Sequence, residues 1–249
     1  MEIVILTALG VGGATVLGAV FGLIFKRTSK AFNDGAMSVA AGVMLAAAMI
    51  GLILPSLEYG GELGVITTIF GILFGALCLD FFDLIVLKRI GNGAWGLAAN
   101  DSESLRRVLL FVTAIALHNL PEGIAAGVGF GTGDSGAGIF IATAIAIQNI
   151  PEGMSVIVAM LGVGIRPGRT FFVAFLTGVV EIIGTFIGYF AVNLSSAVLP
   201  FVLAFAGGNM LYVIADEMIP EAHSGEENRL STYLLLIGFS LMLLLNAFL

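Results

Sequence analysis

An eleven-residue motif occurs twice in the chain, and each copy places polar and acidic side chains inside a hydrophobic stretch. Residues 113–123 read TAIALHNLPEG and residues 143–153 read TAIAIQNIPEG, which agree at eight of eleven positions. The polar positions are His118, Asn119 and Glu122 in the first copy, and Gln148, Asn149 and Glu152 in the second. An acidic side chain at the centre of a bilayer costs about 2.5–3.5 kcal/mol on insertion scales. Two such clusters therefore require a compensating partner, and a bound cation is the simplest one.

The spacing within each copy suits a shared cation. Residues three and four apart lie on one face of a helix, so Glu122 can reach the same ion as His118 or Asn119. The second copy repeats this arrangement. The copies lie near the midpoints of consecutive hydrophobic stretches, which cross a membrane in opposite directions. We therefore expect them to face one another at similar depth, as in transporters built from inverted repeats.

Each motif also contains a proline inside the expected helix. Because proline has no N–H, Pro121 and Pro151 leave the carbonyl groups of Leu117 and Ile147 without their helical partners. A free carbonyl oxygen beside a carboxylate suits a cation or its hydrating water. The alternative is a packing kink, but two matched copies at matched depth favour the cation site.

A third carboxylate, Glu181, lies midway through a later hydrophobic stretch, with no basic residue within ten positions. No membrane-embedded Lys or Arg is present to neutralise these acids, so they must be protonated or bind metal. One imidazole, several carboxylates and amide oxygens suit Zn²⁺, Fe²⁺, Mn²⁺ or Cd²⁺ better than Cu⁺, which prefers sulfur. Cys78 is the single cysteine, which excludes an intramolecular disulfide or a cysteine-based metal site.

Composition predicts an all-α polytopic membrane protein with one domain, 1–249. Hydrophobic residues make up 59% of the chain and charged residues 11%, whereas a soluble domain carries about 25% charge. Stretches long enough to cross the hydrocarbon core recur along the chain. We expect eight, at about 3–25, 36–54, 63–87, 105–130, 137–161, 170–192, 197–219 and 231–249. No nucleotide-binding loop or nucleic-acid-binding segment is expected.

Basic residues indicate the orientation. All ten lie at alternate connections between the expected spans: Lys26, Arg27, Lys30, Lys88, Arg89, Arg106, Arg107, Arg166, Arg169 and Arg229. The positive-inside rule places those connections in the cytoplasm and both termini outside. We expect a multi-pass protein of the plasma or bacterial inner membrane, with the first stretch retained as a span because no basic residue precedes it.

Glycines four residues apart occur inside several spans. The pairs are Gly18/Gly22, Gly71/Gly75, Gly123/Gly127 and Gly184/Gly188. Such spacing lets helix backbones approach closely in lipid. It favours tight packing within the chain; a homodimer contact and a sliding surface are the alternatives.

The paired HNLPEG and QNIPEG motifs, the eight spans, the outward termini and Glu181 resemble the ZIP (Zrt/Irt-like) family of divalent metal transporters. The Gln-bearing second motif is similar to the family's GufA-like bacterial and archaeal branch. The resemblance implies an eight-helix bundle that moves zinc, and also cadmium, iron or manganese, into the cytoplasm by alternating access. The metal is the substrate, and no organic cofactor is implied. Spans 1, 4, 5 and 6 would slide against the other four.

The resemblance also implies a binuclear site at the membrane midplane. One metal would be held by His118, Glu122, Gln148 and Glu152, and the second by Asn119, Asn149, Glu152 and Glu181, with Glu122 or Glu152 bridging. Many family members have His at the position of Gln148, and some have Asp at that of Asn149. A Gln oxygen binds zinc more weakly than imidazole, which predicts a looser, less zinc-exclusive site.

Two other classes of function compete with transport. A His and a Glu four residues apart could hold a catalytic zinc, but the chain has only two His, so an enzyme is not expected. A metal sensor or scaffold without flux is the other class. Outside the motifs, Asp216 and Glu217, near His223, could receive metal leaving the core or form a solvated helix end. Asp80 is expected at a solvated or salt-bridged helix end.

Overall fold

A computed structural model describes residues 1–25, 29–91, 103–130, 135–194, 196–223 and 228–248. In this part of the chain, eight helical segments are long and apolar enough to cross a membrane, and each overlaps one of the predicted stretches. The elements are α1 (Glu2–Ile24), α2 (Lys30–Ala46), η1 (Ala47–Ile53), α3 (Leu54–Tyr59), η2 (Gly61–Leu63), α4 (Gly64–Gly91), α5 (Glu103–Gly129), α6 (Ser135–Gly162), α7 (Pro167–Leu194), η4 (Ser196–Val198), α8 (Leu199–Val213), η5 (Ile214–Met218), α9 (Ile219–Ala222) and α10 (Asn228–Asn246). The predicted all-α, eight-span fold is confirmed.

The second span is longer than predicted, because helix begins at Lys30 rather than near residue 36. The Ser29 side chain caps α2 by accepting a hydrogen bond from the Phe32 N–H at 3.2 Å. Side-chain caps of this kind stabilise the first helical turn. This polar turn precedes the apolar stretch, so hydropathy alone does not reveal it.

Spans 2 and 7 each contain a π-helical segment, η1 and η5. In both, the helix that follows has proline as its second residue, Pro55 in α3 and Pro220 in α9. Proline has no N–H and its ring crowds the carbonyl of the residue four positions earlier, which explains why the regular helical ladder is interrupted before it. Such π segments are frequent at functional sites.

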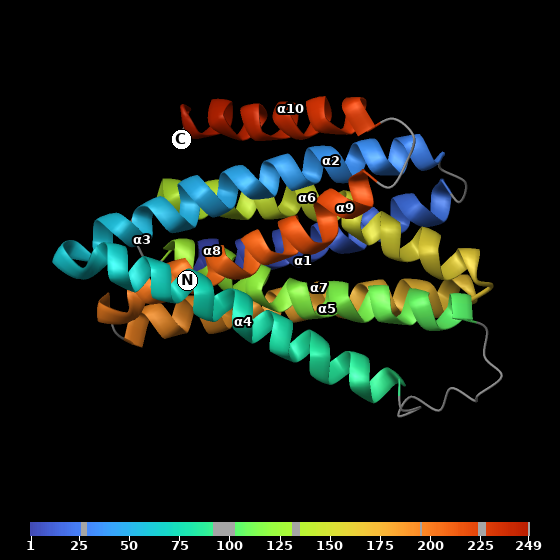
Figure 1. The fold of residues 1–249 in the computed structure, drawn as a ribbon, viewed down its shortest axis with the longest axis horizontal. Coiled ribbons are helices and arrows are strands. Elements are labelled where there is room, and N and C mark those ends of the chain that lie inside the picture. The colour runs from blue at the N-terminus through green and yellow to red at the C-terminus, as the bar shows by residue number, and fades with distance from the viewer. Residues whose placement is uncertain (26–28, 92–102, 131–134, 195, 224–227, 249) are drawn as a thin grey trace.

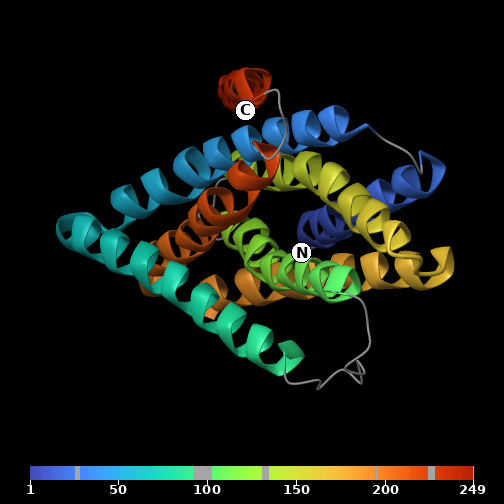
Figure 2. The same ribbon diagram turned by 45° about the vertical axis from the view of Figure 1, so that its right-hand side comes forward.

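The helices pack as two groups. One consists of α1, α5, α6 and α7, where α1 packs on α6 and α7, and α5 packs on α7. The other consists of α2, α4, α8 and α10, where α4 packs on α8 and α2 packs on α10. Figures 1 and 2 show α4 and α10 at the periphery of the bundle.

Glycines make the contacts within each group close. A Cβ at Gly123 would lie 2.2 Å from the carbonyl oxygen of Glu181, and one at Gly75 would lie 2.3 Å from that of Phe205. The glycines of all four predicted pairs lie against another helix of their own group. The predicted tight packing within the chain is therefore confirmed.

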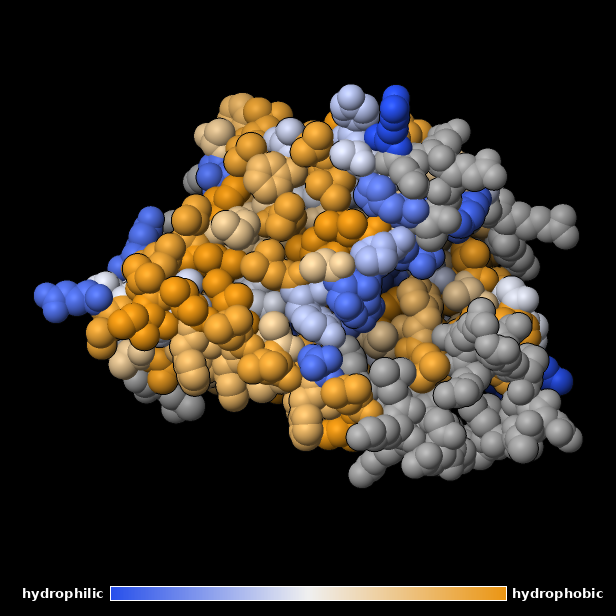
Figure 3. All heavy atoms as spheres, in the orientation of Figure 1, coloured by the Kyte–Doolittle hydropathy of each residue, from blue (hydrophilic) through white to orange (hydrophobic). Residues whose placement is uncertain are grey.

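The two groups meet at a buried apolar layer. Span 2 contributes Met44, Ala47 and Leu52, which pack in the same cluster as Ile141 and Ile145 of α6. Elsewhere the bundle exposes large hydrophobic side chains, and Figure 3 shows them covering most of one face, with hydrophilic residues gathered near its middle. This distribution is that of a multi-pass membrane protein.

Candidate metal centre

Three helices carry the seven residues predicted as metal ligands. His118, Asn119 and Glu122 lie on α5, Gln148, Asn149 and Glu152 on α6, and Glu181 on α7. All are buried except Glu152, which is partly exposed and lines a cavity. Helices α5 and α6 continue without a break through Pro121 and Pro151. The motifs are therefore held on continuous helices.

Glu122 and Gln148 meet across the α5–α6 contact. The Gln148 Nε2 group donates a hydrogen bond of 2.6 Å to Glu122 Oε1. The other oxygens of both side chains, Glu122 Oε2 and Gln148 Oε1, are buried with no hydrogen-bond partner. Buried polar atoms in native proteins nearly always have a partner. Two unpartnered oxygens on paired side chains are a ready place for a cation.

His118 has a partner that the motifs do not contain. Its Nε2 atom lies 3.0 Å from Glu217 Oε1, on the π-helical segment η5 of span 7. Glu217 therefore joins the site, although sequence analysis left its role open. A sequence signal was present: Glu217 stands three residues before Pro220, as His118 does before Pro121.

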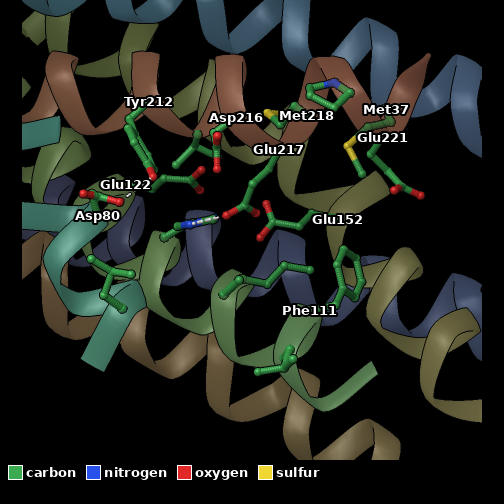
Figure 4. Close-up of a pocket in the computed structure, with 17 residues that line it drawn as sticks. Met37, Asp80, Phe111, Glu122, Glu152, Tyr212, Asp216, Glu217, Met218 and Glu221 are labelled. Carbon is green, nitrogen blue, oxygen red and sulfur yellow. Dashed lines mark hydrogen bonds and ion pairs between the residues drawn. The ribbon is translucent and has the colours of Figure 1, made fainter. Parts of the chain in front are cut away.

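A cavity of about 730 Å³ reaches these side chains. Figure 4 shows the carboxylates of Glu122, Glu152 and Glu217 directed into it. Its walls come from the ends of α4 and span 7 and from the starts of α2 and α5. These helix ends lead to connections where the basic residues lie, so the cavity opens at the basic end of the bundle.

Asp80 and Asp216 line the same cavity. Asp80 accepts a 3.2 Å hydrogen bond from the Tyr212 hydroxyl, so it belongs to the cavity wall rather than to a separate helix end. His223 lies elsewhere: its Nδ1 is 2.9 Å from the Ile219 carbonyl oxygen and its Nε2 is 3.2 Å from Thr232 Oγ1.

A second group of contacts surrounds Glu181. Asn149 Nδ2 donates to Glu181 Oε2 at 2.9 Å and to the Val11 carbonyl oxygen at 3.2 Å. The Thr15 hydroxyl lies 3.0 Å from both Glu181 oxygens. Asn149 Oδ1 is buried and has no partner, and neither Oδ1 nor Nδ2 of the buried Asn119 has one. Thr15 was not among the predicted site residues, because it lies alone in the first apolar stretch, far from the motifs.

Comparison with known proteins gives the family. The model of the ZIP zinc transporter family matches residues 96–246. The chain is 38% identical to the zinc transporter GufA of Myxococcus xanthus, over 94% of each chain. It is also 36% identical to the zinc transporter ZIPB of Bordetella bronchiseptica, over 94% of this chain and 77% of that one. This chain belongs to the ZIP family.

Membership confirms the resemblance drawn from the HNLPEG and QNIPEG motifs, including the likeness to GufA. The family extends to animals, since the human zinc transporter ZIP11 is 30% identical over 94% of this chain and 93% of its own. ZIP proteins are transporters, which makes divalent metal ions the expected substrates and a membrane the setting.

The donor set of this ZIP chain is mixed. Among the residues that the structure describes, no three His, Cys, Asp or Glu side chains by themselves form a cluster able to hold a metal. The buried amide oxygens are therefore further candidate donors. The five buried atoms without partners on Asn119, Glu122, Gln148 and Asn149 include four oxygens. Carboxylate and amide oxygens with one imidazole suit a borderline-hard divalent cation.

Proposed function

We propose that this chain carries zinc, and related divalent cations such as cadmium, iron or manganese, into the cytoplasm of its cell through the centre between α5, α6 and α7. One observation carries the proposal most: Glu122, which has a buried oxygen without a partner, and Glu152 line a cavity that opens at one end of the bundle, and Gln148 beside Glu122 has a second unpartnered oxygen. The names of the relatives support zinc as the main substrate.

The first cation position comprises His118, Glu122, Gln148 and Glu152. In the structure the amide nitrogen of Gln148 faces Glu122, so the amide must rotate to present Oε1 to a cation. Rotation breaks the 2.6 Å hydrogen bond and frees Glu122 Oε1 at the same time. When metal binds, the hydrogen bond between Gln148 and Glu122 is thus replaced by bonds from both side chains to the ion.

The second position comprises Asn119, Asn149, Glu152 and Glu181. Glu122 or Glu152 bridges the two ions, which places two dications among shared carboxylates. Both positions contain two carboxylates, but the second has two amides where the first has an imidazole and an amide. Because an amide oxygen is a weaker zinc ligand than imidazole, the second position binds its cation more weakly than the first.

The cavity reaches the centre from one side. On the other side, Met44, Ala47, Ile141 and Ile145 are almost completely buried in the layer between the two helix groups. Alternating access follows if α1, α5, α6 and α7 slide as one body against the other four spans. The glycine contacts support this, since they bind helices within each group. Glu217 and Asp216 then receive the cation as it leaves His118.

The positive-inside rule supplies the direction. The basic residues of the sequence lie in the connections that follow or precede the helix ends lining the cavity, which supports a cytoplasmic location for that end and termini outside. The conformation with an open cavity is then the one that releases metal to the cytoplasm of a bacterial inner or plasma membrane.

Uptake into liposomes tests the proposal. Purified protein is reconstituted with a zinc-sensitive dye inside, and external zinc is added. Transport predicts a fluorescence rise in protein-containing vesicles, whereas a membrane hydrolase or a metal sensor predicts none.

The variant Glu152→Ala should abolish this uptake and lower the bound zinc, because Glu152 belongs to both cation positions and lines the cavity. Normal uptake by a folded Glu152→Ala protein would disprove the assignment of the site, while an inactive wild-type protein would disprove transport.

A further inference from the structure

Glu181 is held by a side chain from the first span. The Thr15 hydroxyl on α1 lies 3.0 Å from both oxygens of the Glu181 carboxylate, and both side chains are fully buried. A donor equidistant from the two oxygens restrains rotation of the carboxylate about its terminal bond. Hydrogen bonds to an ionised acceptor are among the strong ones in proteins. The orientation of Glu181 therefore depends on α1.

The same contact extends to Asn149. Its Nδ2 group donates both to Glu181 Oε2 at 2.9 Å and to the Val11 carbonyl oxygen at 3.2 Å. With its nitrogen bound to α7 and α1, the amide has one preferred orientation. Its Oδ1 atom is then left buried and unpartnered, available to a cation.

Close backbone contacts let a short side chain reach Glu181. A Cβ at Gly12 would lie 2.4 Å from the Gly178 carbonyl oxygen, and one at Gly153 would lie 2.2 Å from the Thr15 carbonyl oxygen. These contacts press α1 against both α7 and α6. Any larger residue at Gly12 or Gly153 would move α1 away and lengthen the hydrogen bonds of Thr15.

We propose that Thr15 is a positioning residue for the second cation position, defined by Asn149 and Glu181. Thr15 does not contact the cation. It orients Glu181 and, through Glu181, the amide of Asn149. The inference rests on the proposed function, because it requires a cation at that position. Since the position formed by His118, Glu122, Gln148 and Glu152 draws on other contacts, loss of the Thr15 hydroxyl should weaken only the second cation.

Calorimetric titration of the purified full-length protein with zinc chloride tests this. Thr15→Val keeps the volume of the side chain but removes its hydroxyl. It should weaken the second binding step by about tenfold or more, the range expected for a hydrogen bond to a charged group, and leave the first step unchanged. Thr15→Ser keeps the hydroxyl and should bind both ions as the wild type does.

Thr177→Val is the matched control. Thr177 is buried on α7, one turn from Glu181, but its hydroxyl donates to the Ala174 carbonyl oxygen of its own helix at 2.8 Å. Removing that hydroxyl changes neither cation position, so both binding steps should be unaltered. Should Thr15→Val fail to fold, Thr15→Ala removes the same hydroxyl with no added bulk and replaces it in the titration.

Each result decides the matter. Unchanged binding by Thr15→Val overturns the proposal, as does equal weakening of both steps or a Thr15→Ser protein as impaired as Thr15→Val. A wild-type protein that binds a single zinc ion also overturns it. The liposome assay on the same samples separates the two proposals. Two bound ions without uptake would disprove transport but not the role of Thr15. Uptake with an unaltered Thr15→Val titration would disprove the role of Thr15 but not transport.

Discussion

Gly51 lies where the two helix groups meet, and Gly51→Ala should impede the movement between them. Gly51 is in η1 of span 2, and the Cβ of an alanine there would lie 2.6 Å from Ile141 Cγ1 of α6. The same Cβ would lie 3.2 Å from Ile141 Cδ1 and 3.4 Å from Phe140 Cδ1. Ile141 is fully buried, so it has little room to move aside.

The expected shift between the two conformations follows from the cost of the added methyl group. Overpacking a close-packed interior by a methyl group costs about 1–3 kcal/mol. If the groups slide, this cost falls on the conformation with the cavity open and is relieved when α6 moves past span 2. A cost of about 1–3 kcal/mol on one of two conformations shifts their ratio by about 5- to 150-fold. Gly51→Ala should therefore reduce the fraction of molecules with an open cavity.

The exposure of a cavity residue reports that fraction. Leu110 lines the cavity, so a Leu110→Cys variant in a Cys78→Ser background reacts with a water-soluble thiol reagent when the cavity is open. Adding Gly51→Ala should slow this labelling, and zinc uptake should fall with it. Gly13→Ala is the matched control, because a Cβ at Gly13 has no atom within 4 Å.

Equal labelling rates and equal uptake in the Gly51→Ala protein and the control would refute the sliding of one group past the other. The contact would then be one that the structure absorbs locally. A lower melting temperature without a change in labelling has the same consequence, since overpacking would have destabilised both conformations alike.

Three further substitutions test other parts of the molecule. Gln148→His should tighten zinc binding by about tenfold, or about 1.4 kcal/mol, and slow zinc release, because imidazole is a stronger zinc ligand than an amide oxygen. Unchanged affinity in a zinc titration would show that Gln148 is not a ligand. Glu217→Gln keeps the shape of the side chain but removes the charge 3.0 Å from His118. It should lower the maximal rate of uptake severalfold with little change in the number of ions bound, as measured by metal analysis. Gly127→Ala should destabilise the fold by about 1–3 kcal/mol, because its Cβ would lie 2.0 Å from the Thr185 carbonyl oxygen, and a thermal melt in detergent checks this.

The fold was predictable because hydrophobic length and basic residues are local properties of the sequence. Two features could not be predicted in this way: the capped polar turn before the second apolar stretch, and the two π-helical segments. A cap adds helix without adding hydrophobicity, as the Ser29 side chain does at the start of α2. A proline such as Pro220 signals an irregularity, but whether the helix kinks, breaks or widens depends on how the neighbouring helices pack.

The candidate site was predictable where the motif repeats, and less so elsewhere. Glu122 and Gln148 lie at the same depth because the motif stands near the middle of each of two consecutive antiparallel spans. Thr15 has no such signal, since a lone threonine in an apolar stretch usually bonds to its own helix, as Thr113 does to the Leu109 carbonyl oxygen. Only the close approach of α1 and α7 distinguishes it.

Glu217 shows why residues outside the two motifs matter for the mechanism. A site built from the two motifs alone would hold a dication among several carboxylates with no way to lower the barrier for its departure. Glu217 lies against His118 on its cavity side and belongs to the other helix group. In the proposed mechanism, a cation can therefore pass from ligands on the first helix group to a carboxylate on the second, and Asp216 and Asp80 line the same cavity. Release then requires no step in which the ion loses all its protein oxygens at once, and the acids that pass it on are the ones that the cavity exposes to water.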